Sequence, residues 1–240
     1  MKSDGVPMTV SARWQVFPDR AALAAHATML ILASARAAIA AHGQFRLVLS
    51  GGQTPLAVYA RLATARAEWP HWHWYFGDER CLPAGDAGRN DTAIRHVWLD
   101  HIAAPPANIH AIPAELGAQA AARQYAALLT GLGDFDLVLL GLGEDGHTAS
   151  LFPGRPLAAS AEVLAVHDAP KPPSERVTMS AARLSRARQV LFLVTGADKR
   201  AAVTAWRAGA DIPARAISGN VQVLLDAAAA AEEPSTTGSR

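Results

Sequence analysis

The stretch GLGEDGH, residues 141–147, places a carboxylate at Asp145 and an imidazole at His147 in a loop that contains three glycines. It comes directly after FDLVLL, residues 135–140, whose apolar run is typical of a buried strand. Glycine lets a backbone approach a ligand closely, and an imidazole can take up a proton at neutral pH. The types and spacing of these residues therefore indicate either a catalytic loop or a cradle for a cofactor.

The same loop carries the pattern G-x-G-x-x-G, residues 141–146, which dinucleotide-binding proteins share. In those proteins the last glycine opens a long helix, whereas Pro153-Gly154 ends this segment after six residues. Asp145 would also bring a carboxylate toward a pyrophosphate. The sequence therefore predicts a loop that presents Asp145 and His147 for catalysis and binds no nicotinamide cofactor. A histidine that only caps a backbone carbonyl is the structural alternative.

SGGQTP, residues 50–55, follows the predicted strand at 45–50. Two glycines and the free N–H groups of a helix start favour a bound anion. Thr54 is expected as the N-cap and Pro55 as the first residue of a helix that runs to about Arg66. The Gly-Lys-Ser/Thr element of a P-loop is missing, which excludes a nucleotide site of that kind. An ordinary strand-to-helix turn is the alternative.

Charged residues follow two further predicted strands and a proline-rich segment. DER, residues 78–80, comes after the strand at 72–77. Lys199 begins a helix after the strand at 189–196, and a lysine in the first turn opposes the helix dipole unless an anion binds there. Arg176 follows the stiff segment PKPPSE. A solvent-facing charge is the alternative for each of them.

Apolar runs alternate with helical segments along the chain. Strands are predicted at residues 45–50, 72–77, 135–140, 189–196 and 221–226, and helices at 21–42, 55–66, 92–102, 114–133 and 197–206. This alternation predicts a single α/β domain, a three-layer αβα sandwich with a mostly parallel, Rossmann-like sheet. Ligands of such folds bind beyond the carboxyl ends of the strands, where the polar loops would meet. Residues 1–230 are expected to form the domain and 231–240 a disordered tail.

The composition narrows the classes of function. Half of the 240 residues are hydrophobic and the net charge is +1 without a basic block, so neither a nucleic-acid nor a membrane partner is expected. Cys81 is the single cysteine, which excludes an internal disulfide and a cysteine-based metal cluster. Histidines such as His71 and His73 lack a metal-binding constellation. No signal-peptide pattern is seen, and a cytoplasmic location is the expectation.

Residues 21–42 are long and apolar enough to be considered as a membrane span. The segment is rich in alanine, contains Arg36, and runs from a plausible cap at Asp19 to a stop at Gly43. An arginine near the centre of a span costs about 2.5–3.5 kcal/mol, and alanine offers little in return. The sequence therefore predicts a helix that packs on the sheet.

In this order, these stretches resemble the 6-phosphogluconolactonase family, which is related to the glucosamine-6-phosphate deaminases. The resemblance rests on LSGGQTP (49–55), WHWYFGDERCLP (72–83), GLGEDGHTASLFPG (141–154), PKPPSERVTM (170–179), VTGADKRAAV (194–203) and IPARAISGNVQVLLDAAAA (212–230). They span nearly the whole chain, and the set is specific although each piece alone is not. Asp86 and Asn90 resemble the family's short loop after the DER element, which is GDAGRND in this chain.

The resemblance implies hydrolysis of 6-phospho-D-glucono-1,5-lactone, a sugar δ-lactone of the oxidative pentose phosphate pathway. It implies His147 as the general base that activates water, Asp145 as the group that fixes its position or tautomer, and Arg80 as the stabiliser of the developing charge. The implied substrate- and phosphate-binding residues are Ser50, Gly51, Gly52, Thr54, Asp78, Asn90, Gly143, Arg176 and Lys199. No cofactor or metal is implied, because a lactone is already an activated ester. A monomer or weak homo-oligomer is expected.

Two other functions stay open at the level of sequence. An isomerase and deaminase of amino-sugar phosphates would use the same phosphate site and the same Asp-Gly-His. In that branch the segment after the histidine resembles Asn-Glu-Pro, whereas it is ASLFP here, residues 149–153, so a carboxylate for proton transfer is missing. A non-catalytic sugar-phosphate sensor would tolerate the loss of His147, which is present.

Overall fold

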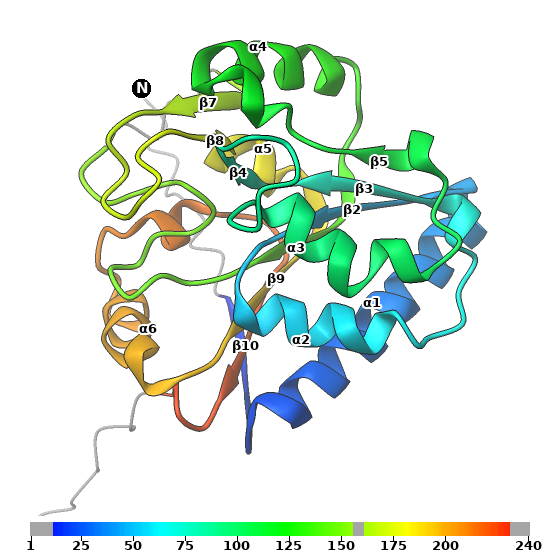
Figure 1. The fold of residues 1–240 in the computed structure, drawn as a ribbon. Coiled ribbons are helices and arrows are strands. Elements are labelled where there is room, and N and C mark those ends of the chain that lie inside the picture. Colours follow the sequence, from blue (N-terminus) through cyan, green and yellow to red (C-terminus); the bar gives the residue numbers. More distant parts are fainter. Residues whose placement is uncertain (1–11, 156–160, 231–240) are drawn as a thin grey trace, which may run out of the picture.

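Seven parallel strands form the central sheet of the molecule (Figure 1). The computed structural model describes residues 12–155 and 161–230 of the chain. The strands are β1 (Arg13–Phe17), β2 (Phe45–Leu49), β3 (Trp72–Phe76), β5 (Ile109–His110), β6 (Phe135–Leu140), β9 (Ala187–Val194) and β10 (Val221–Asp226). Their order is β1-β10-β9-β6-β2-β3-β5, and each neighbouring pair is parallel. The predicted α/β fold is confirmed.

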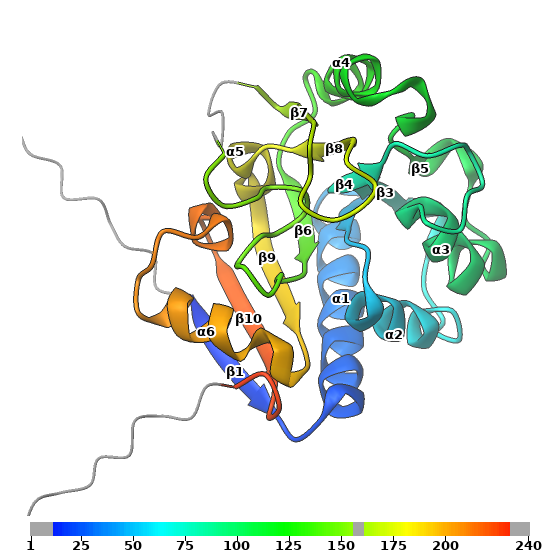
Figure 2. The ribbon, with the colours of Figure 1, turned by 60° about the vertical axis from the view of Figure 1, so that its left-hand side comes forward.

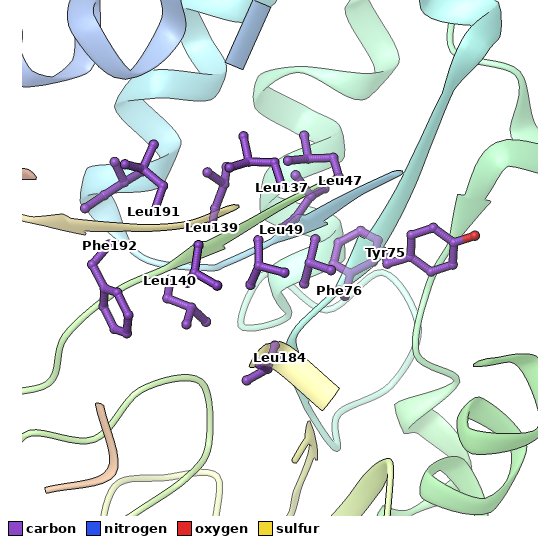
Figure 3. Packing of buried hydrophobic residues seen from close by; sticks show 14 of the residues in the cluster. Leu47, Leu49, Tyr75, Phe76, Leu137, Leu139, Leu140, Leu184, Leu191 and Phe192 are labelled. Atoms are coloured by element: carbon purple, nitrogen blue, oxygen red, sulfur yellow. The ribbon is translucent and has the colours of Figure 1, made fainter. Parts of the chain in front are cut away.

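Helices cover both faces of this sheet and complete three layers. On one face lie α1 (Arg20–His42), α2 (Gln53–Leu62) and α3 (Asn90–Val97), and on the other α5 (Ala181–Ser185) and α6 (Arg200–Arg207) (Figure 2). Leu137 and Leu191 point to one face of the sheet (Figure 3). Leu140 and Phe192 point to the other, which is the face where Leu184 of α5 lies (Figure 3). Because both faces are buried, the strands read as continuous apolar runs.

The long helix α1 has the boundaries that the sequence predicts. The carboxylate of Asp19 accepts a hydrogen bond from the N–H of Ala22 (2.8 Å), and Gly43 ends the helix in the left-handed region at φ 81°. By length and composition, α1 is the one helix of the described residues that could cross a membrane. In the fold it packs against β2, β6 and β10, and it buries Leu23 and Ile31. The predicted packing on the sheet is confirmed.

A second, smaller sheet is absent from the sequence prediction. Its strands are β4 (Asp78–Arg80), β8 (Arg176–Met179) and β7 (Val163–Val166), which pair antiparallel, and α4 (Ala118–Leu129) covers them. The sequence indicates a loop at residues 78–80, but the pairing makes this segment a strand with Arg80 opposite Arg176. Strands of three or four residues are too short for a detectable alternation of polar and apolar positions.

The start of α2 also differs from the prediction. The helix begins two residues earlier, with Gly52 at its N-cap (φ 101°), so Thr54 is not the cap. The hydroxyl of Thr54 instead lies 2.6 Å from the hydroxyl of Thr195. Pro55 is tolerated in the first helical turn because N–H groups there have no acceptor within the helix.

Other helix boundaries shift as well. α2 ends at Leu62 instead of Arg66. The helix predicted at residues 114–133 is divided by Gly117 (φ 82°) into a 3₁₀ turn and α4. The 3₁₀ helices are Trp69–His71, Leu99–His101, Pro106–Asn108, Ala114–Leu116, Ala197–Lys199 and Pro213–Ala216. The predicted tail at residues 231–240 lies outside the described part of the chain.

Candidate active site

A cavity of about 370 Å³ lies beyond the carboxyl ends of β2 and β6. These strands are neighbours at the centre of the sheet, but the chain continues from β2 into α2 on one face and from β6 toward β7 on the other (Figure 1). The two loops diverge and leave a crevice, as expected at the switch point of an open α/β sheet. The volume suits a small molecule.

The cavity brings together eleven of the twelve residues that the sequence indicates for the site. They come from six segments of the chain: Ser50, Gly51, Gly52, Thr54, Asp78, Arg80, Asn90, Gly143, His147, Arg176 and Lys199. The twelfth, Asp145, is hydrogen-bonded to the ring of His147. Their proximity is a structural finding, and their individual roles stay predictions.

The loop after β6 is shaped around His147. The backbone carbonyl of His147 accepts a hydrogen bond from the N–H of Gly143 (2.7 Å). A Cβ atom at Gly143 would lie 2.0 Å from Nδ1 of His147, so only glycine fits under the imidazole. Gly146 has φ 84°, and a side chain there would meet Ile212. Gly143 is therefore required by the placement of His147, and Gly146 by its backbone conformation and the contact with Ile212.

Asp145 fixes the orientation of the His147 ring. Its Oδ1 lies 2.5 Å from Nδ1 of the ring and accepts a second hydrogen bond from the His147 backbone N–H (3.1 Å). Partial burial raises the pKa of Asp145, but these hydrogen bonds and the nearby imidazole bring it below its ordinary value. A carboxylate on Nδ1 keeps the proton there. In the neutral ring Nε2 is then the nitrogen that carries the free lone pair.

A buried tyrosine holds the loop after β2. The hydroxyl of Tyr59, in α2, accepts from the N–H of Ser50 (3.1 Å) and donates to its carbonyl (3.0 Å). Burial raises the pKa of Tyr59, so this hydroxyl keeps its proton. Gly51 has no room for a side chain, because a Cβ atom would lie 2.0 Å from Oδ1 of Asn90. The positive end of the α2 dipole consequently lies at the cavity.

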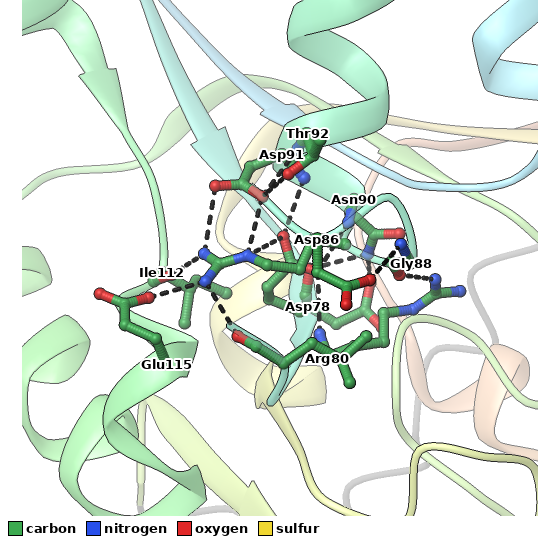
Figure 4. Close-up of polar contacts among 12 residues, drawn as sticks. Asp78, Arg80, Asp86, Gly88, Asn90, Asp91, Thr92, Ile112 and Glu115 are labelled. Carbon is green, nitrogen blue, oxygen red and sulfur yellow. Dashed lines mark hydrogen bonds and ion pairs between the residues drawn. The ribbon is translucent and has the colours of Figure 1, made fainter. Parts of the chain in front are cut away.

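Asp78 joins three segments at the cavity wall. The hydroxyl of Ser150, in the loop after β6, donates to Oδ2 of Asp78 (2.6 Å). Nδ2 of Asn90, at the start of α3, donates to Oδ1 (3.3 Å) and to the Asp78 carbonyl (3.0 Å) (Figure 4). Because both carboxylate oxygens accept bonds from the protein, Asp78 positions Asn90 and the loop after β6.

Glu79 is fully buried beside Asp78, and the sequence does not single it out for the site. Its carboxylate accepts hydrogen bonds from the backbone N–H groups of Arg80 (2.8 Å), Asn90 (2.7 Å) and Asp91 (2.8 Å). Burial raises the pKa of Glu79 to about 7, although the three N–H donors act in the opposite direction. Glu79 thus ties β4 to the first turn of α3, and with it two residues of the cavity.

Arg89 is buried in the loop between β4 and α3. Its guanidinium donates to Asp91 (2.9 Å), to Glu115 (2.7 Å) and to the carbonyl of Ile112 (3.0 Å) (Figure 4). In the sequence it is one more charge in GDAGRND. Its partners lie up to 26 positions away, which no local pattern reveals. Arg89 therefore anchors the loop that presents Asn90, and it does not line the cavity.

Arg80 and Arg176 line the cavity from β4 and β8, two paired strands of the small sheet. Nη1 of Arg80 donates to the carbonyl of Gly88 (2.6 Å), while its Nε is buried with no acceptor among the described residues. Arg176 donates through Nε to the carbonyl of Pro173 (3.1 Å) and through Nη2 to that of Lys171 (2.8 Å). Both guanidinium groups are held by backbone carbonyls and keep further N–H groups for a ligand.

Three more cationic side chains line the cavity, and the sequence indicates one of them. Lys199 lies 2.8 Å from Asp198. Lys171, from the proline-rich segment, lies 3.3 Å from Glu144. Arg20 reaches the cavity from the first turn of α1. The sequence misses Lys171 and Arg20 because neither follows a predicted strand closely.

Residues 12–155 and 161–230 contain no group of three or more His, Cys, Asp or Glu side chains that could hold a metal ion. His71 is hydrogen-bonded to the carbonyl of Gly43 (3.1 Å), and His73 to the ring of His110 (3.3 Å). Burial raises the pKa of Cys81 to about 11, so its thiol stays protonated at neutral pH.

Comparison with known proteins assigns the chain to a family. The profile described as glucosamine-6-phosphate isomerases/6-phosphogluconolactonase matches residues 18–225. The chain belongs to this family. Among its relatives, the 6-phosphogluconolactonase of Mycobacterium tuberculosis is 38% identical, over 94% of this chain and 100% of its own length. That of Nostoc sp. is 37% identical, over 91% of this chain and 97% of its own length.

A solved structure gives the same result for the fold. The 6-phosphogluconolactonase from Trypanosoma brucei superimposes with a TM-score of 0.83 at 28% identity, covering 91% of this chain and 97% of that one. Sequence and structure thus agree on the glucosamine-6-phosphate isomerase/6-phosphogluconolactonase family, and the resemblance that the motifs indicate is confirmed.

Proposed function

We propose that this protein is a 6-phosphogluconolactonase, which hydrolyses 6-phospho-D-glucono-1,5-lactone to 6-phosphogluconate. The observation that carries the proposal is the His147–Asp145 pair at a cationic cavity, with Nδ1 held by the carboxylate and Nε2 left to act as a base. Full-length relatives that are 35–38% identical carry this name. The enzyme is a lactone hydrolase of the pentose phosphate pathway.

The reaction needs one base and one group that stabilises negative charge. In our proposal Nε2 of His147 takes a proton from water while the water oxygen bonds to C1 of the lactone. Negative charge moves onto the carbonyl oxygen, and the guanidinium of Arg80, which lines the cavity, stabilises it. The intermediate then breaks its C1–O5 bond, and the protonated His147 returns the proton to O5. Asp145 balances the imidazolium charge during both steps.

The phosphate on C6 is proposed to bind at the other side of the cavity. The loop from Ser50 to Thr54 offers the start of α2, and Lys199 and Arg176 offer positive charge. Gly143 and Asn90 also line the cavity and are proposed to contact the sugar. No metal and no cofactor takes part in this scheme, so turnover should be unaffected by EDTA.

One comparison of activities tests the proposal. Acid release from 6-phosphogluconolactone, above the spontaneous rate, is measured beside ammonia release from glucosamine 6-phosphate. We expect lactone hydrolysis without ammonia, because residues 149–153 supply no carboxylate after the histidine. Ammonia release without lactone hydrolysis would assign the chain to the deaminase branch. Binding of sugar phosphates without either activity would make it a sensor.

We further propose that the enzyme works as a monomer or a weak homo-oligomer. The support is that one chain supplies every residue that the proposed scheme uses. Light scattering of the purified protein over a range of concentrations measures this, and a stable dimer at the lowest concentration would contradict it.

A further inference from the structure

Arg20 occupies an unusual place for a cation. It is the first residue of α1, directly after the capping Asp19, and its side chain is exposed at the edge of the cavity. A positive charge in the first turn of a helix opposes the helix dipole and is unfavourable without an anion nearby. The carboxylate of Asp19 is already used to cap Ala22. The position of Arg20 therefore needs another reason.

The charges around the cavity are not balanced. Five cations line it, namely Arg20, Arg80, Lys171, Arg176 and Lys199, and three carboxylates, namely Asp78, Glu144 and Asp198, which leaves a net charge of +2. Both lysines are paired, one with Glu144 (3.3 Å) and one with Asp198 (2.8 Å). Among the described residues, Arg20 has no carboxylate oxygen within 4.0 Å. Its charge is available to a ligand.

Arg20 is also connected to the loop after β2. Its Nε donates to the hydroxyl of Thr195 (3.2 Å), which lies at the end of β9 and is buried. That hydroxyl lies 2.6 Å from the hydroxyl of Thr54. Either hydroxyl can donate in this contact; in our inference Thr195, which accepts from Arg20, gives its own proton to Thr54. The proton of Thr54 is then left to point at a ligand in the cavity.

We propose that Arg20 is a specificity-determining residue that binds the substrate's phosphate through its two Nη groups and orients the Thr54 hydroxyl through Thr195. This inference rests on the proposed function. A guanidinium offers a planar pair of donors that matches two phosphate oxygens, which an ammonium group cannot do. A phosphate dianion would neutralise the net +2 charge of the cavity lining. Arg20 therefore distinguishes a phosphorylated lactone from a plain one.

The first experiment compares two lactones. For Arg20→Gln we expect kcat/KM on 6-phosphogluconolactone to fall roughly 5- to 30-fold, mostly through KM, since an exposed charge contributes less than a buried one. On D-glucono-1,5-lactone, which lacks the phosphate, the same variant should match the parent within about twofold. Arg20→Lys should recover part of the loss. Arg36→Gln is the matched control and should change nothing, because Arg36 is an exposed arginine on the same helix whose Nε also donates a hydrogen bond, in its case to the carbonyl of Leu32.

The second experiment separates this inference from the proposed function. Calorimetric titration with inorganic phosphate and with 6-phosphogluconate measures binding without turnover, and Arg20→Gln should weaken both. Weaker binding in the variant, together with a parent that hydrolyses no lactone, would refute the proposed function and leave the role of Arg20 standing. Unchanged binding, or equal losses on both lactones, would refute the role of Arg20. Thr195→Val should raise KM for the phosphorylated lactone less than Arg20→Gln does, and an unchanged KM would rule out the hydroxyl relay.

Discussion

Two histidine–aspartate pairs lie among the described residues, one at each end of the central sheet. At the carboxyl end, Nδ1 of His147 lies 2.5 Å from Oδ1 of Asp145. At the amino end, Nε2 of His42 lies 2.9 Å from Oδ1 of Asp136. The side chains and the distances are similar, so the difference in chemistry must come from the surroundings.

The surroundings of the two carboxylates are opposite in kind. Asp136 has a side chain that is 4% exposed, and it also accepts from the backbone N–H of Arg46 (2.8 Å) and lies 3.2 Å from Nε of Arg188. Asp145 is 45% exposed, and His147 lines the cavity beyond β2 and β6. The carboxylate of the amino-end pair is held by a backbone N–H and a second cation besides its histidine, whereas, among the described residues, that of the carboxyl-end pair is held by His147 alone. We expect the position beyond the carboxyl ends of the strands to select the His147 pair for catalysis.

The largest expected effect separates the two histidines. His147→Asn should lower turnover by about 10²- to 10⁴-fold, the usual contribution of a positioned general base, without loss of folding. His42→Asn should leave turnover within about twofold of the parent. Steady-state kinetics and circular dichroism of both variants measure this. Near-normal turnover of His147→Asn would place the base elsewhere, and unfolding of that variant would give the histidine a structural role.

The next effect compares two cations, one from each end of the sheet. Lys199→Ala should lower kcat/KM on the phosphorylated lactone roughly 10- to 150-fold, because it removes a charge-assisted contact to the phosphate. Arg188→Ala, at the amino-end pair, should have no effect on it. The lactone without phosphate is the control substrate, on which both variants should match the parent.

Arg176→Ala is expected to behave differently from Lys199→Ala. Its Nε and Nη2 hold the carbonyls of Pro173 and Lys171, so the variant should lose activity on both lactones. A loss confined to the phosphorylated lactone would instead make Arg176 a phosphate ligand alone.

A smaller effect is expected from substitution of the two aspartates, which should change turnover in one case and stability in the other. Asp145→Asn should lower turnover roughly 10- to 100-fold with little change in stability, less than for a buried triad aspartate because water can replace part of this exposed contact. Asp136→Asn should instead lower the free energy of unfolding by about 1–3 kcal/mol, because buried donors lose their acceptor. Turnover and urea unfolding of both variants test this crossed pattern. Similar losses of stability in both variants would contradict the different roles that we expect for the two aspartates.

The smallest predicted effect is a dependence of stability on pH. Burial raises the pKa of Glu79 to about 7 from an ordinary 4.5, so the folded protein binds this proton more tightly than the unfolded chain. This contribution to stability is complete below the unfolded value and is lost as pH rises through the folded one. Glu79→Gln should therefore flatten the fall of Tm between about pH 5 and 7. Parallel curves for parent and variant would show that Glu79 stays ionised.

The sequence predicts the elements that are long or deeply buried. The run at residues 135–140 and the helix between Asp19 and Gly43 carry strong periodic or capping signals, and both occur as predicted. The strands of the small sheet, β1 and β5 carry two to five residues each and give no such signal. Their pairing depends on contacts distant in sequence, such as that between Arg80 and Arg176.

Within the site, too, local signals could be predicted and contacts between distant residues could not. Residues directly after predicted strands, such as His147 and Ser50, could be placed at one edge by topology alone. Arg20 could not, because its link to Thr195 spans 175 positions. Glu79 is visible as a charge in the DER segment, but two of its three backbone partners, Asn90 and Asp91, come from the packing of α3, which the sequence does not specify.

The position of β1 at one edge of the central sheet has a consequence for how the chain folds. β1 pairs with β10, and Arg13 donates to Asn220 across 207 positions of sequence. During synthesis β1 must therefore wait, without its partner, until the 207 positions that separate Arg13 from Asn220 have been made. Pairings of such long range slow folding and leave strand edges open to other chains in the meantime. Destabilising β10 should consequently favour aggregation of the nascent chain more than destabilising β3, whose neighbour β2 is made shortly before it.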